Sequence, residues 1–504
     1  MKSPPEYQQL VQYMEEVVDL NNLAALASWD RQTNMPPAGA NARKRQLTTL
    51  RSLIHEKMTA PGLGEILDSL QKWEKKIPYE SEQAATIRVA RRDYQEAASI
   101  PPELIREKSV ASAEGFEAWI QARQEGDFSL FLPSLRRNHA ISKKIALALK
   151  PDSNPLDTRI DLREPGFTAE EIEIIFTELK NQLVRLLEQI STDYDCVDDS
   201  VLHQHYPADL QWGTTLRGVR SIGFDPDKRG RQDKSVHPFT TSFSPDDVRI
   251  TTRIKEDNFA AAFFASLHEA GHGSYEQGLP CKFGRSVLGD GTSGGMHESQ
   301  SRLWENLVGR SRQFWQFFYP QMRELFPRQT EGVEMNDFYL AVNKVNPSLI
   351  RVEADEVTYN LHIIIRFELE KEVYDGELDL ADLPQAWNQK YHDYLGIAPE
   401  SPVDGVLQDI HWSGGFGASF VSYTLGNIIS VQLFEAASDE ISGMKDDFTR
   451  GNFAPLLQWM QENIHNNGRK FKPKELVRRA TGQTFSLDPY LSYIKNKFTD
   501  IYNL

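Results

Sequence analysis

The pattern that most constrains this chain is a pair of histidines, His268 and His272, at the end of an apolar run. Phe259, Phe263 and Leu267 recur at every fourth position before the pair, which predicts a helix with one buried face. Residues four apart lie on nearly the same side of a helix, so both imidazoles can reach one metal ion. The spacing therefore predicts a core helix that presents two metal ligands.

A glutamate follows the first of these histidines and completes an H-E-x-x-H pattern, which is a signature of metalloproteases. Glu269 is close enough to hold a water on the metal but is angled away from ligating it. An accidental match would place two surface histidines on a solvated helix, and the apolar run argues against that reading. Gly271, Gly273 and Gly278 are predicted to loosen or end the helix just past the second histidine, as an opening to a cleft would require.

Two histidines leave the site incomplete, because a catalytic zinc ion usually has three protein ligands and an open position for water. A second amphipathic stretch opens at His297-Glu298-Ser299-Gln300, and its apolar face contains Leu303, Trp304, Leu307 and Val308. From the first turn of that helix, Glu298 could reach the same metal. Glu305 lies on nearly the same face and competes for this role. Alternatively, Glu305 does not bind the metal and forms an ion pair. Spacing favours Glu298 but leaves Glu305 open.

Charge and cysteine content limit the classes of partner. The chain has 56 basic and 72 acidic residues and a net charge of −16, which argues against nucleic-acid and anionic-membrane partners. It contains two cysteines, Cys196 and Cys281, so no disulfide framework is expected. The sequence shows neither the apolar core of a signal peptide nor an apolar run of about 18 residues that could span a membrane. These features favour a cytoplasmic protein.

Helical patterns dominate the chain. Good helix formers extend over residues 6–150, interrupted by proline-containing turns, and a further helix is predicted near 168–193. Residues 240–243 and 249–252 have the composition of short strands. We therefore predict a mainly α protein with a small β-sheet next to the metal helix. It is expected to be one domain over residues 1–504, with a helical N-terminal part (1–200), the small sheet (203–253) and a helical catalytic part (257–504).

Residues 350–370 have the pattern of one long helix with an unusual polar face. That face is formed by charged and aromatic residues at helical spacing, namely Arg351, Asp355, Tyr359, His362 and Arg366. A charged helix face is usually solvated. Alternatively, this face lines a cleft, where Arg351 could grip a carboxylate through its planar guanidinium group. Spacing alone does not decide between the two interpretations.

A third polar cluster, residues 408–412, precedes a glycine-rich segment at 413–417. The glycines permit close approach of the backbone and unusual dihedral angles. Tyr423 follows within an apolar helical pattern, and it and Trp412 could simply be core aromatics. In the functional interpretation, Tyr423 or His411 stabilises an oxyanion, because each can present a hydrogen-bond donor where negative charge develops.

Taken together, these segments resemble the motifs of the carboxypeptidase Taq family, a family of metallocarboxypeptidases. They occur in the family's order and extend over nearly the whole chain, which makes them more specific than one H-E-x-x-H pattern. The motifs are His237-Pro238-Phe239, Asp247-Val248-Arg249-Ile250-Thr251, the metal helix at 268–272, His297-Glu298-Ser299-Gln300, Ile350-Arg351-Val352-Glu353-Ala354-Asp355 and Gly405-Val406-Leu407-Gln408-Asp409-Ile410-His411-Trp412. The segments at 29–37 and 480–483 also look like parts of this family.

The resemblance implies a large helical, zincin-like body with a deep active-site cleft, usually a homodimer, that removes single residues from the carboxyl termini of peptides. Glu298 matches the family's third metal ligand, Arg351 the arginine that binds the substrate's terminal carboxylate, and Tyr423 a tyrosine in the active site. The motifs also assign substrate binding to His237, Arg249, Asp355 and His411. One departure is the glycine-rich segment 289–295, where a more apolar and helix-friendly sequence would be expected.

The predicted function is hydrolysis of the last peptide bond by a metal-dependent carboxypeptidase of broad specificity. One divalent ion per subunit is expected, with zinc favoured and cobalt or manganese as alternatives. Glu269 is the predicted general base, and Tyr423 stabilises the oxyanion. A helical zinc endopeptidase or oligopeptidase is the nearest alternative. A scaffold that keeps zinc for stability is a third, but structural zinc sites are usually closed by four ligands.

Overall fold

Helices form most of the chain in the computed structural model, which describes residues 2–191 and 194–504. One sheet of three strands lies among these residues. Contacts between residues separate the chain into two compact units. Unit 1 contains residues 1–98, 199–342 and 429–485, and unit 2 contains residues 99–198, 343–428 and 486–504. The assignment of residues 1–504 to one domain stays a prediction.

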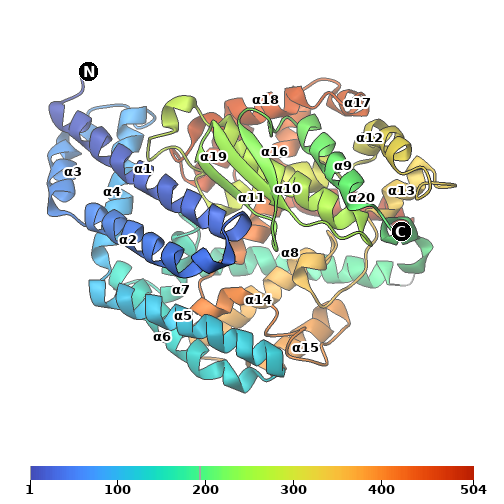
Figure 1. Cartoon of the computed structure of the whole chain (residues 1–504), viewed down its shortest axis with the longest axis horizontal. Coiled ribbons are helices and arrows are strands. Elements are labelled where there is room, and N and C mark those ends of the chain that lie inside the picture. Colours follow the sequence, from blue (N-terminus) through green and yellow to red (C-terminus); the bar gives the residue numbers. More distant parts are fainter. Residues whose placement is uncertain (1, 192–193) are drawn as a thin grey trace. The chain divides into compact units, whose positions relative to one another are not determined.

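Four helices at the start of the chain belong to unit 1, where the sequence predicted successive helices. They are α1 (Pro5–Thr33), α2 (Ala40–Met58), α3 (Pro61–Glu74) and α4 (Glu82–Ser99). Proline occupies the first turn of α1 and α3, where its missing N–H removes no helical hydrogen bond. α1 and α2 lie side by side (Figure 1). Buried apolar residues of α1, α3 and α4 form one cluster, which Phe283 and Leu288 complete.

The predicted strands form the sheet that precedes the metal helix. β1 (Gly230–Lys234) pairs in parallel with β3 (Asp247–Thr252), and β2 (Thr240–Ser244) pairs antiparallel on the other side of β3. The expectation of sheet over the whole of 203–253 is wrong at its start, because α9 (Ala208–Ser221) occupies that region. Gly213, Gly218 and neighbouring threonines weaken the helical signal of α9. Gly218 instead gives α9 close contact with Phe263.

The helix α10 (Phe259–Gly278) lies under the sheet, packed against β2 and β3 (Figure 1). It begins at Asn258, whose side chain accepts a hydrogen bond from the Ala261 N–H. The predicted apolar face is confirmed, since the rings of Phe259 and Phe263 are stacked with centroids 5.3 Å apart and both are buried.

The prediction that glycines loosen or end α10 just past the second histidine is wrong for Gly271 and Gly273, because the helix continues to Gly278 and ends there. Gly271 and Gly273 lie inside it and serve close packing. A Cβ atom on Gly271 would lie 2.6 Å from the Ser301 Cα atom, and one on Gly273 would lie 2.6 Å from the Phe224 ring. Such contacts are too short for any larger residue, so the glycines set how closely the neighbours approach.

The remaining helices of unit 1 follow α10 or come from the C-terminal third of the chain. α11 (Gly294–Arg302) continues directly into a π-helical segment, η6 (Leu303–Val308), as the predicted second amphipathic stretch. The others are α12 (Arg312–Leu325), α13 (Met335–Ala341), α17 (Met444–Thr449), α18 (Ala454–Asn463) and α19 (Pro473–Thr481), with short 3-10 turns at η1 (Pro37–Gly39), η4 (Ser200–His203), η5 (Cys281–Phe283) and η9 (His465–Asn467).

Unit 2 is also helical. Its helices are α5 (Pro102–Glu125), α6 (Leu132–Leu149), α7 (Pro155–Asp161), α8 (Ala169–Ile190), α14 (Tyr359–Asp375), α15 (Leu383–Leu395) and α20 (Asp488–Tyr502), with 3-10 turns at η2 (Phe128–Leu130), η3 (Tyr194–Cys196), η7 (Arg351–Glu353) and η8 (Ile410–Gly414). α5 and α6 pack together as a pair (Figure 1). The chain passes from unit 2 to unit 1 within α16 (Val421–Glu440). α8 begins with a capping box in which Thr168 and Glu171 exchange hydrogen bonds.

The long helix predicted for residues 350–370 is wrong at its start, because α14 begins at Tyr359. Asp355 stops the helical pattern from extending further back. Its Oδ1 accepts from the Val357 and Thr358 N–H groups, and its Oδ2 accepts from the Thr358 hydroxyl and the Asn346 N–H. A carboxylate with these partners favours a turn before the helix. Arg351 therefore lies outside α14, in the short turn η7.

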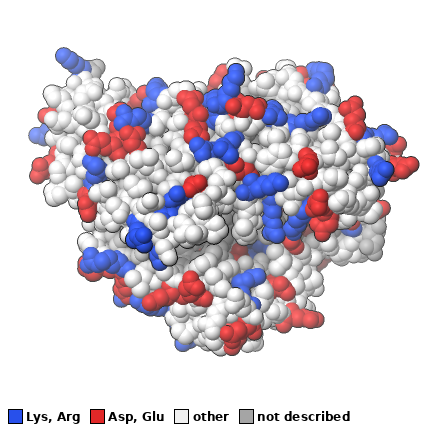
Figure 2. Space-filling view, viewed as in Figure 1, with Lys and Arg blue, Asp and Glu red and all other residues white. Residues whose placement is uncertain are grey.

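The surface carries charged side chains of both signs. On the face drawn in Figure 2, basic and acidic side chains are interspersed, so the net charge of −16 does not gather into one acidic field there. None of the helices among residues 2–191 and 194–504 combines the length and apolar character that crossing a bilayer requires.

Candidate active site

Two helices of unit 1 bring together the three predicted metal ligands. α10 carries His268 and His272, and α11 carries Glu298 in its first turns. Gly271 allows this arrangement, because the missing side chain lets the backbone at Gln300 and Ser301 lie directly against α10. The two histidines can be predicted as ligands from their spacing alone, whereas the position of Glu298 beside them depends on this close packing of two helices.

The distances among these side chains suit one metal ion. The Nε2 atoms of His268 and His272 lie 3.7 and 3.4 Å from the Oε2 atom of Glu298. Two atoms that each lie about 2.1 Å from a tetrahedral ion are about 3.4 Å apart. The three side chains therefore have the spacing of ligands around an ion, which is wider than that of hydrogen-bonded partners.

The local charges favour a cation at this point. Burial alone would raise the pKa of Glu298, but Arg302 and the two imidazoles outweigh it and hold that pKa well below its ordinary value. Burial lowers the pKa of His272 to about 3, so this imidazole is neutral, which is the form that binds metals. Burial also opposes a proton on His268, but the Glu298 and Glu305 carboxylates outweigh it and raise its pKa. A metal ion would take the place of that proton.

The surroundings of Glu269 favour binding of a proton, in contrast to those of Glu298, which keep that carboxylate ionised. Only 7% of it is exposed, and the Thr240 hydroxyl of β2 donates a hydrogen bond of 2.6 Å to its Oε2 atom. Burial raises the pKa of Glu269, although His268 and the Thr240 hydroxyl oppose this. A carboxylate with a raised pKa holds a proton more strongly and is suited to act as a base. The sheet predicted beside the metal helix thus contributes a side chain to the site through Thr240.

Glu305, the competing ligand, contacts the other nitrogen of an imidazole. Its Oε2 atom lies 2.9 Å from Nδ1 of His268, on the ring edge away from Glu298. Arg302 and Arg310 hold this carboxylate, and although burial opposes them they lower its pKa, to about 2. Glu305 therefore has the position of an outer partner that orients a ligand, an arrangement common around metal-binding histidines.

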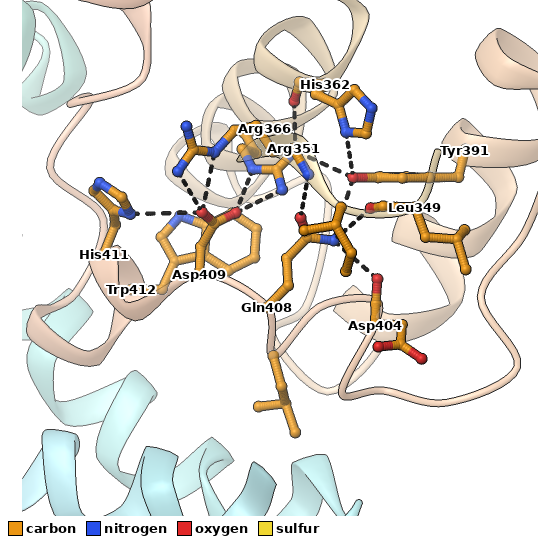
Figure 3. Close-up of polar contacts among 12 residues, drawn as sticks. Leu349, Arg351, His362, Arg366, Tyr391, Asp404, Gln408, Asp409, His411 and Trp412 are labelled. Atoms are coloured by element: carbon orange, nitrogen blue, oxygen red, sulfur yellow. Dashed lines mark hydrogen bonds and ion pairs between the residues drawn. The ribbon is translucent and has the colours of Figure 1, made fainter. Parts of the chain in front are cut away.

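A second polar cluster lies in unit 2 and centres on Asp409 (Figure 3). Arg351 donates to Oδ1 of Asp409 at 3.1 and 3.0 Å. Arg366 donates from Nε to Oδ2 at 2.6 Å, and its Nη2 atom forms an ion pair with the same oxygen at 2.5 Å. Both guanidinium groups are buried, and His411 approaches Asp409 from the other side at 3.7 Å. Burial alone would raise the pKa of Asp409, but Arg366 and Arg351 hold it well below its ordinary value. Two guanidinium charges therefore face one carboxylate charge.

The backbone of Arg351 is fixed as well as its side chain. The Arg351 N–H donates to Oε1 of Gln408 at 3.0 Å. The Gln408 amide nitrogen donates in turn to the carbonyls of Leu349 and Asp404, both at 2.9 Å (Figure 3). These contacts join the segments around 350 and 408, which the sequence analysis identified separately.

Tyr423 and His411, the two predicted oxyanion donors, lie beside this cluster. The Tyr423 hydroxyl is 3.5 Å from Nε2 of His411. The Arg351 guanidinium carbon lies 5.4 Å from the centre of the Tyr423 ring and 5.7 Å from that of Phe420. Unit 2 thus brings together Arg351, His411 and Tyr423. Phe420 was not recognised from the sequence, where it is one aromatic residue among many.

The other predicted substrate-binding residues have different surroundings. His237 is exposed in the connection between β1 and β2. Arg249 on β3 is held by Asp247 at 2.8 and 2.9 Å. Its guanidinium carbon also lies 4.5 Å from the centre of the Trp29 ring, which belongs to the early family-like segment. Asp355 caps α14, as described above. Their roles in substrate binding stay predictions.

Sequence reasoning did not foresee the contacts of several residues in the two clusters. Thr240 was recognised as part of a strand, but period-two patterns do not show which partner a strand residue meets. Arg366 was on the predicted polar face, and Asp409 was in the predicted polar cluster. That they form an ion pair could have been suspected from charge, but not from position, because 43 residues separate them in the chain.

Comparisons with known proteins give matches over nearly the whole chain. The family described as "Carboxypeptidase Taq (M32) metallopeptidase" matches residues 9–498. The chain is 43% identical over 505 residues to thermostable carboxypeptidase 1 of Thermus thermophilus, covering 98% of this chain and 99% of that protein. It is 35% identical over 491 residues to carboxypeptidase 1 of Bacillus subtilis, covering 97% of each.

Solved structures show the same fold. The M32 carboxypeptidase of Deinococcus radiodurans matches with a TM-score of 0.96 and 41% identity, covering 99% of this chain and 100% of that one. The carboxypeptidase of Pyrococcus furiosus matches with a TM-score of 0.94 and 32% identity, covering 99% of each chain. The predicted mainly α fold with a small sheet is confirmed.

Proposed function

Because this chain belongs to the carboxypeptidase Taq (M32) metallopeptidase family and is therefore a metallocarboxypeptidase, we propose that His268, His272 and Glu298 hold its divalent metal ion. The observation that carries this proposal is the spacing of the three ligand atoms, with both Nε2 atoms 3.4 to 3.7 Å from one carboxylate oxygen. A set of two imidazoles and one carboxylate suits Zn²⁺, with Co²⁺ or Mn²⁺ as alternatives.

In this proposal Glu269 is the general base. The ion, when bound, supplies Lewis-acid polarisation of the scissile carbonyl. Glu269 takes a proton from the attacking water and later delivers it to the nitrogen of the departing amino acid. The Thr240 hydroxyl holds Oε2 of Glu269, which leaves Oε1 as the atom that receives the proton. Burial, which raises the pKa of this carboxylate, makes it a stronger acceptor.

We further propose that Arg351 binds the terminal carboxylate of the peptide. Asp409 neutralises only one of the two guanidinium groups that contact it, so the cluster has one positive charge left for an anion. A planar guanidinium group can bind a carboxylate through two parallel hydrogen bonds. Contacts to the terminus rather than to a side chain agree with broad specificity. Tyr423 or His411 then stabilises the developing oxyanion.

The test uses one peptide supplied as the free acid and as the amide, with mass spectrometry of the products. A carboxypeptidase that depends on Arg351 releases single residues in sequence from the free acid and leaves the amide nearly intact. Internal fragments from both forms would identify an endopeptidase and would remove the proposed role of Arg351. Arg351→Lys keeps the charge but loses the planar geometry, so it should raise KM more than it lowers kcat.

Several finer assignments remain predictions. They are substrate binding by His237, Arg249 and Asp355, the homodimer, and the cytoplasmic location. Size-exclusion chromatography with light scattering measures the oligomeric state directly. A monomer at micromolar concentration would contradict the homodimer.

A further inference from the structure

A chain of polar side chains extends from one metal-binding histidine into the protein. Nδ1 of His272 lies 2.6 Å from Nδ1 of His297, and Nε2 of His297 lies 2.8 Å from Oε1 of Glu276. His272 and Glu276 are four residues apart and share a face of α10. His297, from the first turn of α11, lies between them. Glu276 is buried, with 9% of its side chain exposed, so its carboxylate is shielded from water.

The protons shared among His272, His297 and Glu276 have one consistent arrangement. If Nε2 of His272 faces the ion, the proton of this neutral ring is on Nδ1. His272 then donates to His297, whose Nδ1 must be an unprotonated acceptor. The proton of His297 is therefore on Nε2 and is donated to Glu276, which accepts it. Each hydrogen bond fixes the next, so the Glu276 carboxylate determines which nitrogen of His272 is free for the metal.

The same residues could be read as a second metal site, because Glu276, Asp290 and His297 have ligand atoms within 4.8 Å of one another. The distances argue against that reading. The 2.8 Å between His297 and Glu276 is a hydrogen-bond distance, well below the 3.4 and 3.7 Å of the proposed metal ligands. Both ring nitrogens of His297 are already within hydrogen-bond distance of partners, so neither is free to bind an ion.

The glycine-rich segment before α11 gives His297 its room. A Cβ atom on Gly291 would lie 2.9 Å from Cδ2 of His297 and 3.1 Å from the Tyr275 ring. A larger residue here would push the imidazole out of line with its two partners. The need for this space explains why Gly291, within the segment 289–295, departs from the expected apolar sequence. The close approach of Gly291 is independent of the hydrogen bonds of His297.

We propose that Glu276 and His297 are positioning residues for His272, which orient its ring, fix its tautomer and strengthen it as a ligand. The proposal rests on the proposed metal site. His268 has the corresponding partner in Glu305, which contacts its Nδ1 directly, whereas His272 reaches its carboxylate through an intervening imidazole. Outer partners of this kind typically change metal affinity by about 10- to 100-fold.

The test compares Glu276→Ala, Glu276→Gln and the control Asp290→Asn in the full-length protein. Asp290 is an acidic neighbour in the same cluster, but its carboxylate accepts a hydrogen bond from the Gly291 N–H rather than from His297. Zn²⁺ affinity is measured by competition with a chromogenic chelator, and ligand geometry by the visible spectrum of the Co²⁺-loaded protein. Far-UV circular dichroism of the metal-free proteins verifies folding.

We expect Glu276→Ala to weaken Zn²⁺ binding by about 10- to 100-fold and to change the Co²⁺ spectrum. Glu276→Gln keeps an oxygen that accepts from His297, so it should lose less affinity than Glu276→Ala. Asp290→Asn should bind close to wild type. This graded order distinguishes a hydrogen-bond chain from a general loss of negative charge, and Glu276→Gln carries the test if Glu276→Ala does not fold.

The proposal would be overturned if both Glu276 variants kept the Zn²⁺ affinity and Co²⁺ spectrum of the wild type. Equal losses of Zn²⁺ affinity in Glu276→Gln and Asp290→Asn would also overturn it. So would two bound ions per chain, one of which disappears in Glu276→Gln. His272→Ala separates this proposal from the one on which it rests. If His272→Ala binds Zn²⁺ as wild type does, the metal site itself is wrong. If only His272→Ala loses binding, the site stands and the positioning role fails.

Discussion

Four glutamates surround the two imidazoles of α10, and their neighbours give each a different chemical character. Glu298 lies beside Arg302 and faces both Nε2 atoms. Glu305 lies beside Arg302 and Arg310. Glu269 accepts a hydrogen bond from Thr240, and Glu276 contacts His297. Adjacent arginines keep the first two ionised, whereas burial raises the pKa of Glu269. The environment of each carboxylate, more than its identity, sets the role that we propose for it.

At this scale we predict that Glu269→Gln keeps its metal but loses turnover. Glutamine has the shape of glutamate and can still accept from the Thr240 hydroxyl, but it cannot take a proton. Removal of a general base typically lowers kcat by about 10²- to 10⁴-fold. Metal content by mass spectrometry and kcat on a free-acid peptide measure the two effects. Glu65→Gln, an exposed change on α3, is the control. Wild-type turnover in Glu269→Gln would refute the mechanism.

Within the elements, glycine has opposite effects in different helices. Gly271 in α10 has the backbone of α11 directly against it, whereas a Cβ atom on Gly213 in α9 would meet nothing within 4 Å. In an open helical position glycine costs stability relative to alanine, because it loses more backbone freedom on folding. In a packed position it permits an approach that no other residue allows. The position of α11, and with it Glu298, depends on Gly271.

We therefore predict that Gly271→Ala and Gly213→Ala change stability in opposite directions. The added methyl group at position 271 forces α10 and α11 apart, and such overpacking typically costs about 1–3 kcal/mol. The same change at position 213 should stabilise α9 by up to about 1 kcal/mol. Differential scanning calorimetry of the metal-free variants gives the sign of each shift in Tm. A Gly271→Ala protein as stable as wild type would mean that α11 can move without cost.

The segment between η8 and α16 is another element held by one buried residue. Glu370 of α14 accepts from the Trp412 indole N–H at 2.8 Å and from the Ala418 N–H at 2.9 Å. Ala418 has a positive φ of 53°, which an alanine rarely adopts without such support. Tyr374 adds a hydrogen bond to the Phe416 carbonyl at 2.9 Å. These contacts fix the segment that follows His411.

The pH dependence of stability should reflect Glu370. Burial raises its pKa from 4.5 to about 7. Between these values the folded protein keeps a proton that the unfolded chain has released, so stability falls as pH rises through this window, by about 3 kcal/mol in total. Glu370→Gln cannot ionise and escapes this loss. Its Tm relative to wild type should therefore improve from pH 5 to pH 8.

The comparison uses metal-free protein, so that ligand protonation at the metal site does not contribute. Glu117→Gln, an exposed change on α5 in the same unit, is the matched control and should show a constant difference from wild type. A constant difference for Glu370→Gln as well would show that the Glu370 carboxyl titrates normally in the folded state.

At the scale of the whole molecule, the two polar clusters belong to different units. All three proposed metal ligands, together with Glu269, come from unit 1, whereas Arg351, Asp409 and Tyr423 come from unit 2. An ion that binds only the folded protein stabilises it by about 4 kcal/mol when its concentration is about 1,000 times Kd. That stabilisation acts first on the elements that supply the ligands.

We predict that removal of the metal by a chelator lowers hydrogen-exchange protection in α10 and α11 and leaves α14 and α15 largely unchanged. The first two helices supply the proposed ligands, and the other two belong to unit 2. Mass spectrometry of peptic fragments after deuterium labelling resolves these elements. His268→Ala is the control and should show no response to the chelator. An equal loss of protection in all four helices would contradict a local effect.

The sequence by itself determined the features that depend on local spacing. The resemblance of the ordered motifs to a known family implied a metallocarboxypeptidase. The i, i+4 arrangement of His268 and His272 and the apolar face before them predicted a metal-binding helix within a mainly helical body. A helix places its side chains by a fixed period, so these features follow from residues near one another in the chain. The same reasoning placed two of the three strands.

Tertiary structure decided which faces meet. Periodicity shows that Glu298 and Glu305 share a helix face, but only the packing of α11 on α10 turns Glu298 toward both Nε2 atoms and Glu305 toward Nδ1 of His268. The pairing of Arg351 with Asp409 joins residues 58 apart in the chain. Such contacts depend on the docking of separate elements, and no local pattern encodes that. For this reason the sequence predicted a metal-binding helix, and the packing around it selected which carboxylate faces the Nε2 atoms that we propose bind the metal.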